Sequence, residues 1–72
     1  MSRAIVWATV DRARGIAVIT GQNHDELVHE VAPQAKWSRP GRGWILTLAQ
    51  VSDLACLCDI EHAVFRERVK KP

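Results

Sequence analysis

The 72-residue sequence lacks several features that would place it in a familiar class of protein. Its two cysteines, Cys56 and Cys58, lie close together in an apolar stretch, so no disulfide framework is available. No segment approaches the roughly 20 apolar residues that a membrane-spanning helix needs. The first apolar run is cut off by Asp11 and Arg12 and is too short for a signal-peptide core, which predicts a cytoplasmic protein.

Catalytic and metal-binding patterns are lacking too. Cys58 and His62 are four residues apart, but a structural zinc site needs four ligands, usually with CxxC-type spacing. The glycines of segments 14–15 and 41–43 join expected strands, whereas a phosphate-binding loop would open a helix. A chain this short has little room to enclose a pocket of convergent titratable groups. We therefore expect no enzyme activity, no catalytic residues, no metal or other cofactor and no small-molecule substrate.

What the sequence does contain is the composition of one small folded domain over residues 1–72, with 47% hydrophobic and 25% charged residues. Segments rich in β-branched residues predict strands, and polar caps ahead of apolar periodicity predict helices. The expected caps are Asn23, paired with Glu26, and Ser52. The expected strands are 4–10, 16–20, 35–38, 44–48 and 63–69, and the expected helices are 24–32 and 52–60.

The resulting order, ββαββαβ, predicts an α+β domain with one mostly antiparallel sheet and both helices on one face. The hairpin-helix units 4–34 and 35–61 are alike when shifted by 28 positions, which aligns Arg14-Gly15 with Arg42-Gly43. We take a degenerate duplication as a hypothesis.

Alternation along the expected strands assigns side chains to the two faces of the sheet. Trp37 and Trp44 face each other across the second hairpin and are expected to point toward the helices. The other inward residues are Ala4, Val6, Ala8, Val10, Ile16, Val18, Leu46, Leu48, Phe65 and Val69. The open face holds Arg3, Ile5, Trp7, Thr9, Ala17, Ile19, Lys36, Ser38, Ile45, Thr47, Arg66, Arg68 and Lys70.

The net charge of +2 hides a segregation of opposite charges. Segments 22–34 and 49–61 carry six carboxylates and no Lys or Arg, whereas the rest of the chain carries all 10 Lys and Arg against Asp11 and Glu67. Helices on one face would leave the other face basic, with the arginine-bearing turns projecting together at its end.

Two uses of this basic face are open. Its cations can neutralise phosphates while Trp7 stacks on an unpaired base. This hypothesis assigns nucleic-acid binding to Trp7, Arg12, Arg14, Lys36, Arg39, Arg42, Arg66 and Arg68. The alternative is a protein partner, either a second copy or a host protein that the domain inhibits. It would dock on Ile5, Trp7, Ile19 and Ile45. A third interpretation is an ordinary surface that the chain itself partly covers.

The second unit, AKWSRPGRGWILTL over residues 35–48 followed by Val51, Asp53 and Leu54, resembles the HARP-type domain beside the motor of annealing helicases. There, a basic or aromatic turn leads to a Trp-containing strand and then a helix. Small actinobacterial and phage proteins carry similar pieces. The resemblance, over roughly residues 23–60, implies a DNA-binding accessory module that prefers forked or single-stranded DNA. This chain has no ATPase motor, so remodelling is not implied. The matching positions are Lys36, Trp37, Arg39, Arg42 and Trp44.

Overall fold

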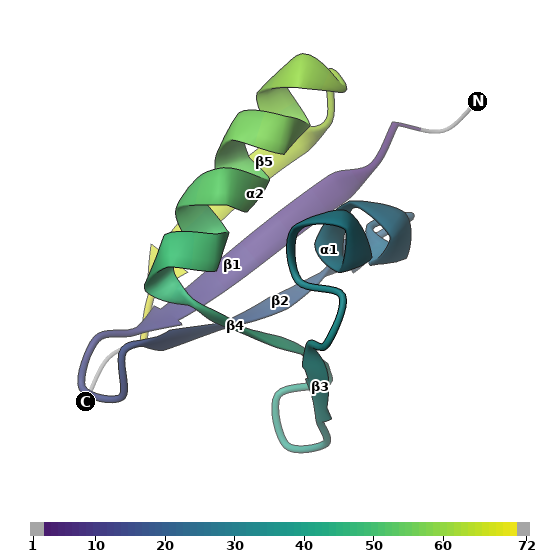
Figure 1. The fold of residues 1–72 in the computed structure, drawn as a ribbon. Coiled ribbons are helices and arrows are strands. Elements are labelled where there is room, and N and C mark those ends of the chain that lie inside the picture. Colours follow the sequence, from purple (N-terminus) through teal and green to yellow (C-terminus); the bar gives the residue numbers. More distant parts are fainter. Residues whose placement is uncertain (1–2, 71–72) are drawn as a thin grey trace.

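A computed structural model describes residues 3–70 as a five-stranded sheet with two helices on one face (Figure 1). The elements follow the expected order, and the α+β class is confirmed. They are β1 (Ile5–Asp11), β2 (Ile16–Gln22), α1 (Asp25–Val31), β3 (Lys36–Ser38), β4 (Gly43–Thr47), α2 (Leu48–Ile60) and β5 (Val64–Val69).

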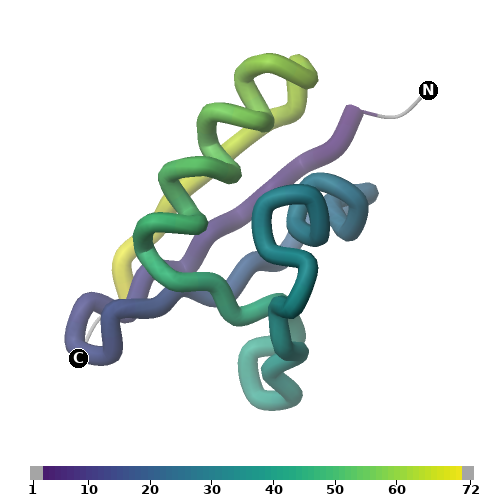
Figure 2. Tube along the Cα trace, viewed as in Figure 1, coloured from purple at the N-terminus to yellow at the C-terminus, as the bar shows by residue number. Residues whose placement is uncertain are grey.

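The strand order is β3-β4-β2-β1-β5, so the two hairpins pair through their second strands, β2 and β4, and β3 and β5 form the edges of the sheet. The pairs β1–β2, β2–β4 and β3–β4 are antiparallel, whereas β1 and β5 are parallel. Parallel neighbours need a crossover connection, and α2 supplies it by carrying the chain back across the sheet to its far edge (Figure 2).

One hydrophobic core lies between the sheet and the two helices. In α2, the buried residues Val51, Leu54 and Cys58 are spaced by three and four positions, which places them on one side of the helix. Small side chains at Ala8 and Ala17 lie on the sheet floor beneath them. The other buried residues are Val6, Val10, Ile19, Val28, Ala32 and Leu46.

The faces expected for β2 were wrong. Ala17 and Ile19 are fully buried, and Ile16 and Val18 lie on the open face instead. The segment IAVIT is apolar on both sides, so alternation alone could not choose between them. Pairing decides the matter, because Ile19 lies opposite Ala8 and directly opposed residues share a face.

Both expected helix caps were wrong. Asn23 has a positive φ of 56°, which Asn tolerates, and His24 takes the N-cap of α1 without a side-chain cap bond. In α2, Thr47 rather than Ser52 is the N-cap. Its hydroxyl accepts the Gln50 N–H at 3.2 Å, and the Gln50 side chain accepts the Thr47 N–H at 2.9 Å. Leu48 therefore begins α2 and is 40% exposed, not an inward strand residue.

The second hairpin has the expected register, with Trp37 opposite Trp44 and Ser38 opposite Gly43. Trp37 lies on the helix-side face, as expected, because it is opposite Trp44 and its ring contacts that of Trp44, but β3 is a three-residue edge strand and leaves Trp37 51% exposed. Val69 is likewise 48% exposed at the opposite edge.

Gly43 is buried, and a Cβ there would clash with the Ile19 carbonyl oxygen, so this close approach of β4 to β2 requires glycine.

The two hairpins are equivalent under a shift of 27 positions, not 28. Both have four-residue turns, 12–15 and 39–42, so Asp11 corresponds to Ser38 and Ile16 to Gly43. A shift of 28 would match buried Ala17 with Ile45 on the opposite face. The identities at that spacing therefore occupy non-equivalent positions, and the duplication stays a hypothesis.

Candidate nucleic-acid interface

The face of the sheet opposite the helices is uncovered within the described residues 3–70 (Figure 1). Alternate residues of β1 project onto it, and the strand registers fix their neighbours. Trp7 lies between Thr20 of β2 and Arg66 of β5, and Thr9 lies between Val18 and Arg68. This open face is therefore apolar and hydroxylic at its centre and basic along the β5 edge.

A groove of about 420 Å³ crosses the open face. Its floor comes from the three central strands, and the 39–42 turn forms one wall. The lining residues are Thr9, Asp11, Arg14, Ile16, Val18, Thr20, Ser38, Pro40, Gly41, Ile45 and Lys70. We call this the open-face groove.

The wall depends on Gly41. Its N–H donates to the Ser38 hydroxyl at 3.2 Å, which folds the turn back over the sheet. A Cβ at Gly41 would lie 2.9 Å from Cγ1 of Val18, so only glycine lets the turn approach the floor this closely. The sequence identified this turn but not its fold onto the sheet.

Asp11 holds two cations at one end of the groove. Its carboxylate lies 3.8 Å from Nε of Arg14 and 3.9 Å from Nζ of Lys70, and it also accepts the Arg14 backbone N–H at 3.3 Å. The Asp11 side chain is only 20% exposed, whereas those of Arg14 and Lys70 are 75% and 61% exposed. The carboxylate is shielded while both cations remain open to an external anion.

Trp7 carries a cation on its ring. The Arg68 guanidinium carbon lies 4.3 Å from the ring centre, within the distance of a cation–π interaction. Arg66 is the direct neighbour of Trp7 on β5, and both arginines are exposed. The three side chains form one basic aromatic cluster beside the open-face groove.

The expected nucleic-acid residues do not all come together. Arg14 lines the groove, and Trp7, Arg66 and Arg68 lie on the same face toward the β5 edge. Lys36 lies opposite Ile45 toward the β3 edge. Arg12 instead lines a hollow on the helix side, next to Leu48 and Glu67.

The two arginine-bearing turns were expected at one end of the face, and this was wrong. Because β2 and β4 are antiparallel and each follows its own turn, the turns lie at opposite ends of the pair (Figures 1 and 2). Arg39 and Arg42 are therefore apart from Arg12 and Arg14.

Sequence reasoning placed Ser38 and Lys70 on this face but not in the binding site, and it assigned Thr20 and Asp11 to neither. Thr20 and Ser38 line the groove, and Asp11 and Lys70 form its charged end. Pairing the first hairpin across its turn would have placed Thr20 beside Trp7. The position of Lys70 depends on the parallel pairing of β5 with β1, for which the sequence holds no local signal.

The apolar interface expected for a protein partner is reduced. Ile19 is fully buried in the core and cannot contact a partner. Ile5, Trp7 and Ile45 stay half-buried on the open face, separated by β2. Val18, which was expected to point inward, bridges part of that separation.

Trp44 is engaged inside the molecule. Its indole N–H donates to the Asp25 carboxylate at 3.0 Å, and its ring meets His29 and Trp37 edge-on at centroid distances of 4.5 and 5.1 Å. These contacts fasten α1 to the second hairpin. Among the positions matched to the HARP-type domain, Trp44 therefore has a structural role here.

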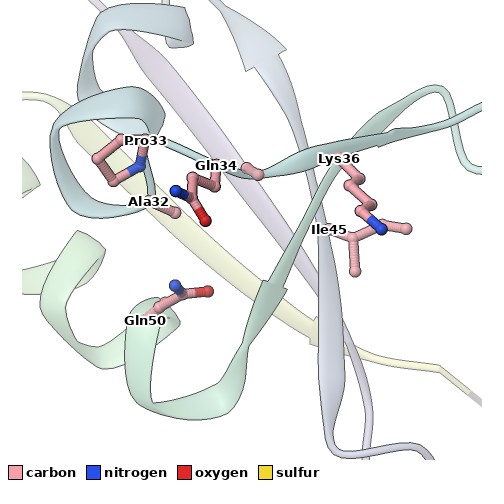
Figure 3. A pocket seen from close by; sticks show the side chains of 7 residues that line it. Ala32, Pro33, Gln34, Lys36, Ile45 and Gln50 are labelled. Carbon is pink, nitrogen blue, oxygen red and sulfur yellow. The ribbon is translucent and has the colours of Figure 1, made fainter.

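A second cavity, of about 470 Å³, lies between the end of α1 and the start of α2 (Figure 3). Gln34 and Gln50 point toward one another across it, and Lys36 and Ile45 lie on its other side. The Gln50 side-chain oxygen already accepts the Thr47 N–H. This cavity therefore offers fewer free polar groups than the open-face groove.

A further hollow of about 640 Å³ lies beside α1, and Glu26, Glu30, Glu61 and His62 are among its lining residues. Among residues 3–70, no three His, Cys, Asp or Glu side chains gather as metal ligands, and no helix is long and apolar enough to cross a membrane. Cys56 is exposed, whereas Cys58 is buried, and burial raises the pKa of the Cys58 thiol.

No protein-family model, curated protein or solved structure matches this chain. The resemblance to the HARP-type domain stays a prediction.

Proposed function

We propose that this domain is a non-enzymatic, DNA-associated accessory module that binds nucleic acid through its open face. The separation of charge across the sheet is the observation that carries the proposal. Arg66, Arg68 and Lys70 lie along one edge of an uncovered face that also presents Trp7, and Arg14 lies near Lys70 beside Asp11. The helices on the other face hold Asp25, Glu26, Glu30, Asp53 and Asp59, and neither helix contains Lys or Arg.

This arrangement suits a polyanion and orients it. Binding of phosphates to the cations of the open face is favoured because it releases counterions, whereas the carboxylates of the helices repel phosphates. Asp11 is the one carboxylate lining the described groove, and Arg14 and Lys70 already compensate its charge.

A titration with fluorescently labelled 20-nucleotide DNA, single-stranded and duplex, tests the proposal at two salt concentrations. For four phosphate contacts, the slope of log K against log salt is expected to be roughly −3 with single-stranded DNA. The double variant Arg66→Gln/Arg68→Gln should weaken binding about tenfold at low salt. Arg12→Gln, which removes one cation on the helix side, is a control and should change binding little. Absence of salt-dependent binding at micromolar concentrations of protein would contradict the proposal.

The second candidate is a protein-interaction module that docks by the same face. The half-buried Ile5, Trp7 and Ile45 favour it, because apolar groups gain from being covered. A second copy would bring Arg66 and Arg68 toward their own counterparts or other cations, which disfavours a face-to-face dimer. Light scattering over a wide concentration range tests it: a strict monomer removes the homodimer, and Trp7→Asp should dissociate a dimer built on this face.

A further inference from the structure

The open-face groove has the dimensions of a small-ligand site, and the inference below rests on the proposed function. At about 420 Å³ it falls within the roughly 300–1,000 Å³ typical of such sites. Most of its lining residues belong to four paired strands, β1, β2, β3 and β4, and the 39–42 turn lies against Val18. Because paired strands supply most of the lining, we expect the shape of the groove to be preformed.

The chemistry of the walls fits a neutral, flat heterocycle with hydrogen-bonding edges. Ile16, Val18 and Ile45 provide apolar contact, and Thr9, Thr20 and Ser38 provide hydroxyls that can both donate and accept. The Ser38 hydroxyl already accepts the Gly41 N–H but keeps its own hydrogen to donate. A phosphate would find no cation on this floor, so the centre of the groove suits a base rather than the backbone.

The two sides of the groove suit the parts of a nucleotide that adjoin the base. At one end, the exposed side chains of Arg14 and Lys70 both lie close to the Asp11 carboxylate. An arriving phosphate can form ion pairs with the same two cations. Beside the groove, Trp7 lies next to Thr20 with Arg68 over its ring. A neighbouring base can stack on that indole or on the guanidinium above it.

We propose that the open-face groove receives one unpaired base of a single-stranded nucleic acid, with an adjoining phosphate at Arg14 and Lys70. A duplex keeps its bases stacked inside and presents mainly phosphates to a broad surface. A duplex would contact the cations but leave the apolar floor of the groove exposed to water. Single strands can splay a base onto an apolar or aromatic surface, so the groove selects for them.

The test compares four labelled 12-mers with the unmodified protein at low salt: deoxythymidine, uridine, an abasic deoxyribose strand and a DNA duplex. Loss of a stacked base costs roughly tenfold or more in affinity. We expect either single strand to bind at least about tenfold more tightly than the abasic strand or the duplex. The uridine arm distinguishes an RNA from a DNA ligand, and tight binding of either supports the inference.

Two other outcomes are distinguishable. Equal salt-dependent binding of all four ligands, or a preference for the duplex, overturns the base site and leaves the proposed function standing. No salt-dependent binding of any ligand overturns both.

A groove-filling variant locates the site. Val18→Phe should weaken binding of the deoxythymidine strand about tenfold while leaving the abasic strand unaffected. Ser52→Phe, on the exposed side of α2, is the matched control and should alter neither. Circular dichroism and thermal unfolding show whether each variant is folded. A folded Val18→Phe protein that binds both strands as the unmodified protein does would contradict the site.

Discussion

The guanidinium of Arg68 lies 4.3 Å from the centre of the Trp7 ring, joining β5 to β1 across the open face of the sheet. Both side chains belong to the face that we propose as the nucleic-acid site. Their contact is half exposed, so its energy is modest in the free protein. It holds a cation and an aromatic surface together before any ligand arrives.

Removing this pair should affect binding more than stability. A double-mutant cycle with Trp7→Leu and Arg68→Gln, measured by urea unfolding, is expected to give a coupling energy of about 0.5–1 kcal/mol. Affinity for a single strand should fall about tenfold or more in Trp7→Leu, because the stacking surface is gone. A variant that loses several kcal/mol of stability but binds normally would show that Trp7 is a core residue and not a ligand contact.

Replacing Asp11 should strengthen binding. In Asp11→Asn, Arg14 and Lys70 lose their internal anion and become free for a phosphate, so we expect tighter binding and a steeper salt dependence. Glu67→Gln removes the same charge from the helix side and serves as the control. If Asp11→Asn weakens binding while the protein stays folded, the carboxylate contacts the ligand itself and the charged end of the groove is wrongly assigned.

The start of α2 can be tested by two alanine variants. Thr47→Ala removes the hydroxyl of the capping box and should lower the free energy of unfolding by about 1 kcal/mol. Ser52→Ala lies within the helix and should leave it unchanged or slightly raised, because alanine has the higher helix propensity. Chemical denaturation of both variants measures the difference. The reverse ranking would restore Ser52 as the cap.

The two faces of β2 give a second stability test. Ile19→Ala empties a fully buried position and should cost about 2–5 kcal/mol. Ile16→Ala on the half-buried open face should cost distinctly less, and it is the same chemical change on the same strand. Equal costs would mean that the open face is packed as tightly as the core, which would contradict an uncovered binding surface.

The buried thiol predicts a pH dependence. Because burial raises the pKa of Cys58, the folded protein binds that proton more tightly than the unfolded chain does. This contribution to stability is present below the ordinary thiol pKa and is lost as pH rises above about 8.5. The free energy of unfolding of Cys56→Ser should therefore fall between about pH 8 and pH 10, and that of Cys58→Ala should fall less. Identical pH profiles would contradict the assignment.

Much of the fold could be predicted from the sequence because its signals are local. The element order followed from β-branched runs and turns, and the opposition of Trp37 and Trp44 followed from the hairpin they share. The face of β2 could not be predicted, because both sides of IAVIT are apolar and the pairing with β1 selects between them. The predicted start of α2 was about one turn too late, because Ser52 is a typical cap residue but the helix is capped by the Thr47 capping box.

The candidate site was less predictable because it is assembled by long-range pairing. The charge segregation and the contribution of Trp7 were visible in the sequence. Arg12 and Arg14 are two residues apart yet lie on opposite sides of the sheet, and only the path of their turn separates them. The closeness of Lys70 to Asp11 arises from a strand pair more than 50 residues apart in sequence.

Mapping backbone amide shifts by NMR during titration with a short single-stranded oligonucleotide tests the central claim most directly. The account predicts that the largest shifts cluster on the open face, at Trp7, Thr9, Val18, Thr20 and Arg68, and that the exposed side of α2 is unaffected. Shifts concentrated on the helices, or no shifts at low salt, would contradict it.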